Sequence, residues 1–166
     1  MLSQQTILVV DDDELLARMV AELLRVEGYE VWTARDGLQG YSSYYQHEAQ
    51  TVVTDIDMPE LGGFEMMRCI RAINPCARAI YMSGAPEQYR RTLVTEAQDF
   101  GAGVLRKPFE GIELLKLIPS LAREKIKPGS YEHEWSPDQK KLVWKEAANS
   151  GGGKGEDRTQ VAATMR

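Results

Sequence analysis

The feature that most constrains the fold is an alternation of short strand-like runs and helical patterns along the first 122 residues. The first run, residues 7–10, is continuously apolar, which is typical of a strand buried on both faces of a sheet. Five strand-then-helix units predict an α/β fold in which helices cover both faces of a parallel sheet. The predicted strands are 7–10, 29–34, 51–54, 79–82 and 103–106, and the helical patterns are 15–24, 38–47, 64–73, 87–98 and 111–125.

Length and composition set aside several functional classes. The 166 residues suit one domain with an appendage. No apolar run approaches the roughly 18 residues that a membrane span needs. Residues 1–122 hold 11 Lys and Arg against 18 Asp and Glu, and this acidic balance argues against nucleic acid as a partner. With two cysteines and no basic leader, we expect a cytoplasmic protein with reduced thiols.

The chain divides by sequence character into a body, residues 1–125, and a tail, residues 126–166. In the tail, Ser136 followed by Pro137 resembles a helix start, with serine as the N-cap and proline at the first helical position. We therefore expect one short helix over 137–148. The glycine-rich stretch that follows is typical of a flexible linker, and we expect disorder after it.

Charged and polar side chains gather where the predicted strands end. The carboxyl ends of parallel strands meet at one edge of a sheet, where doubly wound sheets bind ligands. Carboxylates that share a site resist ionisation unless a cation offsets their repulsion. Magnesium prefers oxygen ligands and needs only one or two carboxylates beside water and phosphate oxygens, so the sequence predicts a magnesium site. The side chains are Asp11, Asp12 and Asp13 after the first strand, Asp55 and Asp57 after the third, Ser83 after the fourth, and Lys107 after the fifth.

Two other interpretations of these acids stay open at this point. An aspartate after a strand is often the N-cap of the next helix, and Asp13 suits that structural role equally well. Asp55 and Asp57 also resemble the Asp-x-Asp nucleophile motif of haloacid-dehalogenase-type phosphatases. Those enzymes carry the motif on their first strand, whereas here it follows the third.

Four motifs, taken in order, resemble the receiver domain of two-component response regulators. They are residues 7–13, 55–63, 82–84 and 107–109, and their order and approximate spacing match that family over residues 5–122. The resemblance implies a doubly wound, flavodoxin-like sheet of five parallel strands in the order 2-1-3-4-5, with helices on both faces. It also makes the body, residues 1–125, a receiver domain.

The resemblance implies a role for each side chain at the strand ends. One carboxylate accepts a phosphoryl group, a bound Mg²⁺ ion neutralises oxygen charge, and two further side chains hold phosphoryl oxygens. The implied roles are phospho-acceptor for Asp55, direct metal ligands for Asp12 and Asp55, a metal ligand through the backbone carbonyl for Asp57, a metal contact through water for Asp11, and phosphoryl-oxygen contacts for Lys107 and Ser83.

The same resemblance implies a regulator rather than an enzyme, because its only catalysis is its own phosphorylation and dephosphorylation. The phosphoryl group would come from a histidine kinase or a histidine phosphotransfer protein. The tail is too short for a DNA-binding output domain, so we expect signalling by protein contact to an unknown partner, without nucleic acid or membrane. The alternatives are a phosphorelay intermediate, a phosphate sink, or a receiver fragment of a hybrid kinase. A homodimer through the fourth helix, fifth strand and fifth helix is a further expectation.

Two departures from the family pattern bear on signalling. The family has an aromatic residue three positions before the lysine, where this chain has Val104. A valine is stiff about χ1 and too small to switch between two positions. The stretch 83–107 is also slightly longer than is usual in the family. We therefore expect the signal to leave through the loop after Ser83 and the fourth helix, across residues 83–98.

Overall fold

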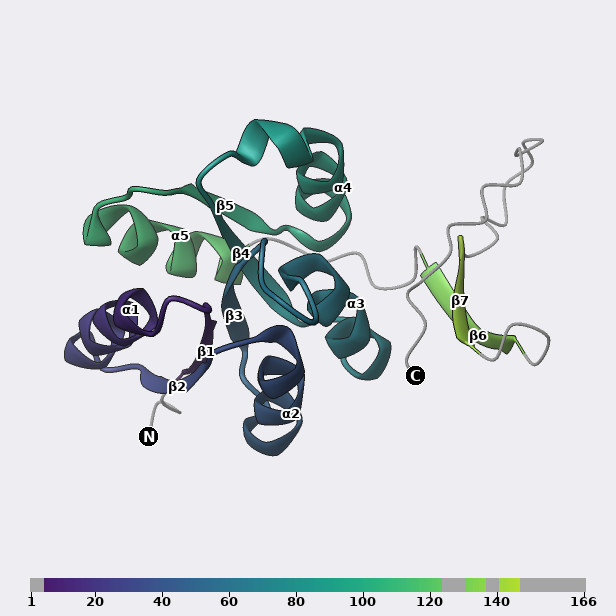
Figure 1. Cartoon of the computed structure of the whole chain (residues 1–166), viewed down its shortest axis with the longest axis horizontal. Helices are drawn as coiled ribbons and strands as arrows, with labels where there is room; N and C mark the ends of the chain where they lie inside the picture. Colours follow the sequence, from purple (N-terminus) through teal and green to yellow (C-terminus); the bar gives the residue numbers. More distant parts are fainter. Residues whose placement is uncertain (1–4, 124–130, 137–140, 147–166) are drawn as a thin grey trace. The chain divides into compact units, whose positions relative to one another are not determined.

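The structure is a computed structural model that describes residues 5–123 and two strands at 131–136 and 141–146. Contacts between Cα atoms divide the chain into two units, Met1–Ile126 and Lys127–Arg166. Each unit has its own sheet (Figure 1). Within the described residues, no helix is both long enough and apolar enough to cross a membrane.

The first unit is built on five strands, β1 Thr6–Val10, β2 Glu30–Ala34, β3 Thr51–Asp55, β4 Arg78–Ser83 and β5 Gly103–Arg106. They form one sheet in the order β2-β1-β3-β4-β5 (Figure 1), and every neighbouring pair is parallel. The central strand β3 is buried along its whole length, as a sheet covered on both faces requires. This topology confirms the doubly wound, flavodoxin-like α/β fold that the sequence predicts.

The helices of the first unit are α1 Glu14–Val26, α2 Gly37–His47, α3 Gly63–Ile73, the 3₁₀ helix η1 Pro86–Tyr89, α4 Arg90–Phe100 and α5 Gly111–Arg123. Alternate residues of β1 show which helices cover which face. Ile7 and Val9 lie in a cluster of buried side chains with residues of α1 and α5. Leu8 and Val10 lie in a second cluster, with residues of α2, α3 and α4. Two helices therefore cover one face of the sheet and three cover the other.

The start of α1 settles the role of Asp13. Its carboxylate accepts hydrogen bonds from the backbone N–H groups of Leu15 and Leu16, at 3.0 and 3.1 Å. These are two of the donors that a helix start otherwise leaves without partners. Asp13 is therefore the N-cap of α1, which is the structural interpretation of this residue.

The segment after β4 differs from the single helix predicted over 87–98. The chain first forms η1, with Pro86 in its first turn, where a missing N–H costs no hydrogen bond. Tyr89 then has φ −107° and ψ 14°, which lies outside the α-helical region. The helix is therefore interrupted at Tyr89, and α4 begins after it.

The second unit contains an antiparallel pair of strands, β6 Tyr131–Ser136 and β7 Lys141–Glu146. The helix predicted over 137–148 is therefore wrong where β7 lies. Ring-bearing and acidic residues alternate along 131–135, and this period of two is typical of a strand. With β6 formed, β7 has a strand to pair with. A helix-start signal is local, and pairing with a second strand overrides it. Residues 137–140 and 147–166, including the predicted linker, lie outside the described residues.

A buried polar cluster joins α3, α4 and β4. Glu96 of α4 accepts hydrogen bonds from the hydroxyl of Tyr81 in β4, at 2.6 Å, and from the guanidinium of Arg71 in α3. The Arg71 and Glu96 side chains are only 3% and 8% exposed. Burial and the Glu96 charge hold the pKa of Tyr81 well above its ordinary value, so its hydroxyl keeps its proton at neutral pH. The Arg71 guanidinium also lies 3.8 Å from the centre of the Phe100 ring. Polar contacts thus attach α4 to the sheet and to α3.

Removing one member of the buried ion pair should destabilise the first unit strongly. We expect Arg71→Leu to lower the free energy of unfolding by about 3 to 5 kcal/mol, because Glu96 then stays buried without a cation beside it. The measurement is urea unfolding followed by circular dichroism. Arg35→Leu is the matched control, since the Arg35 side chain is 71% exposed in its pair with Asp36 and should contribute about 1 kcal/mol or less. Equal losses in the two variants would contradict a special role for the buried pair.

Candidate functional site

The predicted functional side chains lie at one edge of the sheet in the first unit. Parallel strands that end side by side bring the residues at their carboxyl ends together. Two of these side chains are buried carboxylates, which are rare in proteins unless they have partners. Asp11 follows β1, Asp55 ends β3, Ser83 ends β4, and Lys107 follows β5.

Lys107 occupies the centre of this site. Its ammonium group lies 2.8 Å from Oδ2 of Asp11 and 2.7 Å from Oδ1 of Asp55, so one cation pairs with two carboxylates. Its backbone N–H donates to the carbonyl of Ser83 at 2.8 Å, which extends the pairing of β5 with β4 by one residue. The strand pairing therefore determines where the lysine leaves the sheet. The Lys107 side chain is 24% exposed, and solvent reaches it.

Backbone contacts fix the positions of Asp11 and Asp55. The N–H of Asp11 donates to the carbonyl of Ala34 at 3.1 Å, and Oδ1 of Asp11 accepts from the N–H of Asp13 at 2.9 Å. After Asp55, the chain returns so closely that a Cβ atom at Gly63 would lie 2.2 Å from the Asp55 carbonyl oxygen. A glycine is needed there, because any side chain would push the start of α3 away from β3.

The electrostatics of the site oppose ionisation of Asp55. Burial raises the pKa of this carboxyl, and the charges of Asp11 and Asp12 raise it further, while Lys107 works in the opposite direction. For Lys107, burial acts to lower the pKa, but the contacts with Asp11 and Asp55 outweigh it, so the pKa is raised. The lysine therefore stays charged at neutral pH, and the carboxylates around it repel one another.

The other predicted residues surround this centre in different ways. Asp12 has an exposed side chain, close enough for its charge to act on Asp55. The Ser83 hydroxyl oxygen accepts from the N–H of Ala85 at 3.1 Å and keeps its own hydrogen for a second partner. Asp57 is exposed, and its carboxylate accepts a hydrogen bond from the Tyr89 hydroxyl.

The donor set is compatible with magnesium. Among the residues whose side chains the structure describes, no three acidic, histidine or cysteine side chains converge as a ready cage. Magnesium does not need one, because it takes one or two protein carboxylates and keeps several waters. Asp11, Asp12 and Asp55 offer hard oxygen donors, and their mutual repulsion is what a divalent cation relieves.

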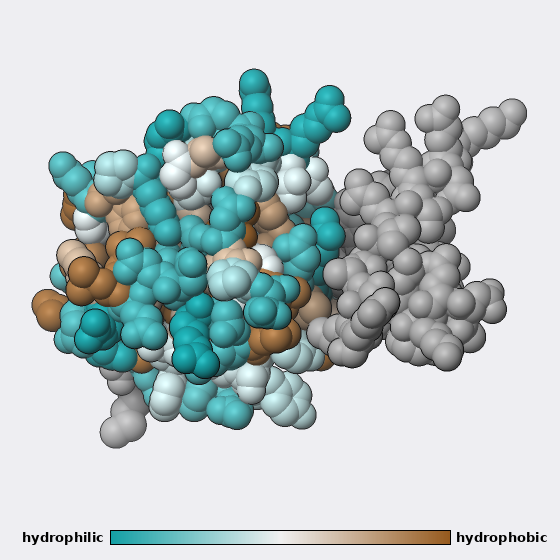
Figure 2. Space-filling view, viewed as in Figure 1, coloured by the Kyte–Doolittle hydropathy of each residue, from teal (hydrophilic) through white to brown (hydrophobic). Residues whose placement is uncertain are grey.

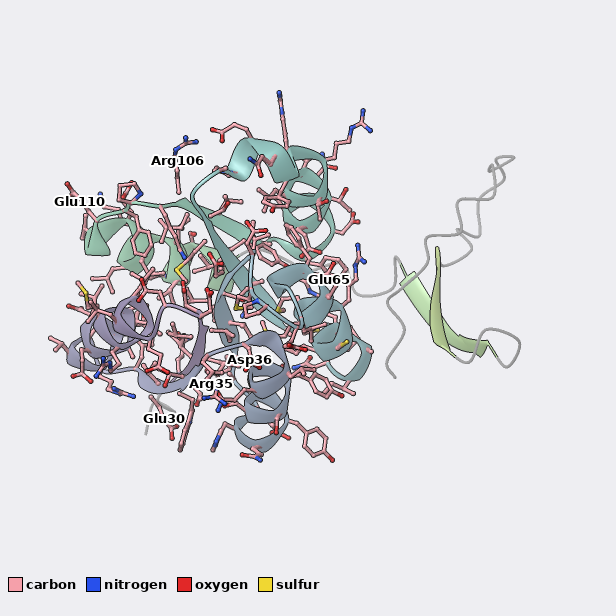
Figure 3. All side chains as sticks on the ribbon, in the orientation of Figure 1. Glu30, Arg35, Asp36, Glu65, Arg106 and Glu110 are labelled. Carbon is pink, nitrogen blue, oxygen red and sulfur yellow. The ribbon has the colours of Figure 1, made fainter. Side chains whose placement is uncertain are left out.

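Two contacts of η1 with the site were not predictable from the sequence. Tyr89 reaches Asp57 in the loop after β3, and Glu87 forms an ion pair with Arg106 at the end of β5. Figure 3 shows the Arg106 side chain projecting from β5 on the side of η1. The only available signal was the extra length of the stretch 83–107, which does not indicate which residues make contact.

Comparison with known proteins identifies the class that this fold and site define. The sequence profile of the response regulator receiver domain matches residues 7–119, which is more than half of the chain. The chain therefore belongs to the response regulator receiver family of two-component signalling. This confirms the resemblance drawn from the sequence and sets aside the phosphatase alternative.

Two relatives illustrate the range of the family. Chemotaxis protein CheY of Bacillus subtilis is 33% identical over 114 residues, which cover 68% of this chain and 92% of that protein. The probable transcriptional regulatory protein TcrX of Mycobacterium tuberculosis is 30% identical over 120 residues, covering 71% of this chain but 50% of that protein. The chain thus spans about half the length of transcriptional regulators that it matches.

Solved structures of the family share the fold. Response regulator TrrA of Thermotoga maritima, solved in complex with Mg²⁺-BeF, is 30% identical with a TM-score of 0.62, covering 71% of this chain and 99% of that one. The CheX–CheY–BeF₃–Mg²⁺ complex of Borrelia burgdorferi matches with 25% identity and a TM-score of 0.65, covering 72% and 90%. Receiver domains bind Mg²⁺ at the phosphorylation site, and this chain offers the oxygen donors for it.

The raised pKa of Asp55 predicts how stability depends on pH. Ionising this carboxyl costs more in the folded protein than in the unfolded chain, so the free energy of unfolding falls as the pH rises above the ordinary value of 3.8. Asp55→Asn cannot ionise. We expect this variant to have a higher free energy of unfolding than the wild type at neutral pH, measured by urea unfolding in magnesium-free buffer.

The gain should shrink as the pH is lowered toward 3.8, where the wild-type carboxyl takes up its proton. Asp36→Asn is the control, because asparagine caps a helix as well as aspartate does and Asp36 is the N-cap of α2. A variant at position 55 that is less stable than wild type at neutral pH would contradict the electrostatic account.

Proposed function

We propose that this chain accepts a phosphoryl group on Asp55 from a histidine kinase or a histidine phosphotransfer protein and passes the signal on by protein contact. The observation that carries the proposal is the buried Asp55 carboxylate with the Lys107 ammonium 2.7 Å away. Phosphoryl transfer asks a protein mainly for positioning and for neutralisation of oxygen charge. A fixed carboxylate beside a fixed cation supplies both.

In the proposed reaction, an oxygen of Asp55 forms a bond to phosphorus while the bond from phosphorus to the donor's imidazole nitrogen breaks. The imidazole leaves with the electron pair. Lys107 transfers one hydrogen bond from the Asp55 carboxylate to a phosphoryl oxygen, and the Ser83 hydroxyl donates to another. The product is an acyl phosphate on Asp55, and water later hydrolyses it.

We propose that Mg²⁺ is held by the carboxylates of Asp12 and Asp55 and the backbone carbonyl of Asp57, with Asp11 acting through water. When bound, the ion adds positive charge beside the phosphoryl oxygens. The raised pKa of Asp55 and the exposed position of Asp12 support this assignment, because the site carries surplus negative charge and solvent reaches one of its ligands. With the ion beside Asp55, the Lys107 ammonium would neutralise charge on the phosphoryl oxygens as well as on Asp11.

An apolar groove of about 600 Å³ opens beside the site, between α1 and the segment that follows β5. Figure 2 shows apolar side chains gathering on this side of the first unit. Met19 is 63% exposed there. Lys107 lines the groove and also pairs with Asp55, so the groove leads to the proposed acceptor. An apolar helix of the phosphodonor that lay in the groove would hold its phosphohistidine close to Asp55. We propose a helix of the phosphodonor as the occupant. The groove is lined by Leu16, Met19, Val20, Leu23, Lys107, Pro108, Phe109 and Gly111.

The proposed output route leads through β4 to α4. Val104 of β5 pairs in register with Tyr81 of β4 and is 38% exposed. Tyr81 is fully buried and bonded to Glu96 of α4, so the aromatic ring beneath this helix comes from β4. Tyr81 stands two residues before Ser83 on the same strand. A shift of Ser83 toward the phosphoryl group would therefore move Tyr81 and alter its hydrogen bond to Glu96 of α4. The homodimer and the cytoplasmic location stay predictions.

Acetyl phosphate and magnesium should modify Asp55 alone. We expect intact-mass spectrometry of the wild type to show one phosphate adduct, because Asp55 is the more exposed of the two carboxylates that pair with Lys107, with its side chain 10% exposed against 1% for Asp11. Asp55→Asn should show none. A comparable adduct on that variant would overturn the assignment of the acceptor.

The same measurement tests the metal assignment. Omitting magnesium should abolish the adduct, and Asp12→Ala should slow its formation about tenfold or more, the scale of one lost charge contact in phosphoryl transfer. Asp36→Asn again serves as the control, since Asp36 is outside the site. An unchanged rate in Asp12→Ala would show that another carboxylate holds the metal.

Phosphorylation should change hydrogen exchange mainly across residues 83–98 and little across 103–106. The reason is that β5 carries Val104, which touches no phosphoryl oxygen and is too stiff to change position, whereas α4 is joined to β4 by Tyr81 and Glu96. The measurement is hydrogen–deuterium exchange with mass spectrometry, with and without acetyl phosphate.

The matched control for this route is Val104→Tyr, which should keep the phosphorylation rate within about threefold of wild type because the substitution lies away from the reacting oxygens. Equal exchange across 83–98 in the two states would favour the alternative of a phosphate sink, in which the domain stores phosphate without changing shape.

A further inference from the structure

The 3₁₀ helix η1 contacts the loop that follows Asp55, the proposed phospho-acceptor. The hydroxyl of Tyr89, the last residue of η1, donates a hydrogen bond to Oδ1 of Asp57. Asp57 stands two residues after Asp55, in the loop between β3 and α3. The contact therefore joins η1 to the loop after β3, across 32 residues of sequence.

Tyr89 also contacts residues other than Asp57. Its ring packs against the ring of Phe64, with centroids 5.7 Å apart, and it lies against the buried cluster beneath α3 and α4. On the other side of η1, Glu87 pairs with Arg106 of β5. η1 thus contacts both β5 and the loop after β3, and these two strands flank β4 in the sheet.

The Asp57 carboxylate is exposed, so without the tyrosine both of its oxygens would be open to water. The Tyr89 hydroxyl is the donor of this hydrogen bond, so its proton points to the Asp57 carboxylate. One carboxylate oxygen is occupied by a protein donor at a place where it could otherwise orient a water molecule.

We propose that Tyr89 is a positioning residue that slows hydrolysis of the aspartyl phosphate by holding the Asp57 carboxylate away from the attacking water. This inference rests on the proposed function, because it concerns the lifetime of phosphorylated Asp55. In the hydrolysis, a water oxygen forms a bond to phosphorus while the bond to the Asp55 oxygen breaks. The Asp55 oxygen keeps the electron pair, the water loses a proton to solvent, and inorganic phosphate leaves.

A carboxylate that accepts a hydrogen bond from this water fixes its direction of attack, and positioning of that kind accelerates reactions. While the Tyr89 hydroxyl occupies Oδ1 of Asp57, the carboxylate is a weaker acceptor for a hydrogen bond from water. The phosphoryl group therefore persists longer than it would beside a free carboxylate. The device acts after phosphorylation and leaves the transfer from the donor unchanged, because neither Tyr89 nor the Asp57 side chain pairs with Lys107 or Asp55.

The experiment follows the decay of the phosphate adduct on the full chain. The protein is phosphorylated with acetyl phosphate and magnesium, the donor is removed by rapid desalting, and intact mass is recorded over time. We expect Tyr89→Phe to decay about three- to tenfold faster than wild type, the scale of one hydrogen bond to a charged group. Its rate of phosphorylation should be unchanged. Tyr45→Phe is the matched control, since Tyr45 lies on α2 and is 70% exposed.

A double-mutant cycle separates positioning from a general loosening of the fold. In an Asp57→Asn background, Tyr89→Phe should change the decay by less than about twofold, because there is no carboxylate to release. Equal acceleration in both backgrounds, or none in either, overturns the inference while leaving Asp55 as the acceptor. A wild-type chain that takes up no phosphate on Asp55 overturns the proposed function and the inference with it.

Discussion

The neighbouring strands β1 and β3 place the carboxylates of Asp11 and Asp55 at one point of the sheet edge. The Lys107 ammonium offsets the repulsion between them. It pairs with Asp11 and Asp55 at 2.8 and 2.7 Å, while burial still raises the pKa of Asp55. The carboxylates of the site therefore repel one another, and a divalent cation can offset that repulsion. Ionising Asp55 therefore costs more in the folded protein than in the unfolded chain, a cost that is common at functional sites.

Attachment of α4 shows how such a site can be connected to a surface. Of the residues of this helix, only Leu93 and Glu96 are buried, and Glu96 is held by Arg71 and Tyr81. Hydrogen bonds and ion pairs depend on direction more steeply than apolar packing does. A small movement of β4 at Ser83 therefore changes the contacts of α4 more than it changes those of a helix packed by apolar side chains alone.

The two places where sequence reasoning failed share one cause. The helix predicted over 137–148 rested on a local start signal, and the pairing of β6 with β7 overrode it. The single helix predicted over 87–98 missed the break at Tyr89, whose conformation accompanies contacts with Phe64 and Asp57. In both cases the deciding contact joins residues that the local pattern does not relate.

The sequence by itself determined the strand-and-helix alternation, the acids at strand ends and the family, because periodicity and the residues after each strand are local properties. It also sufficed to place Asp11, Asp55, Ser83 and Lys107 at one edge, since parallel strands must end together. Only the tertiary structure decided that Lys107 bridges two carboxylates and that Tyr89 binds Asp57. Those contacts span 96, 52 and 32 residues. They depend on side-chain directions that are set when the loops pack, which no local pattern encodes.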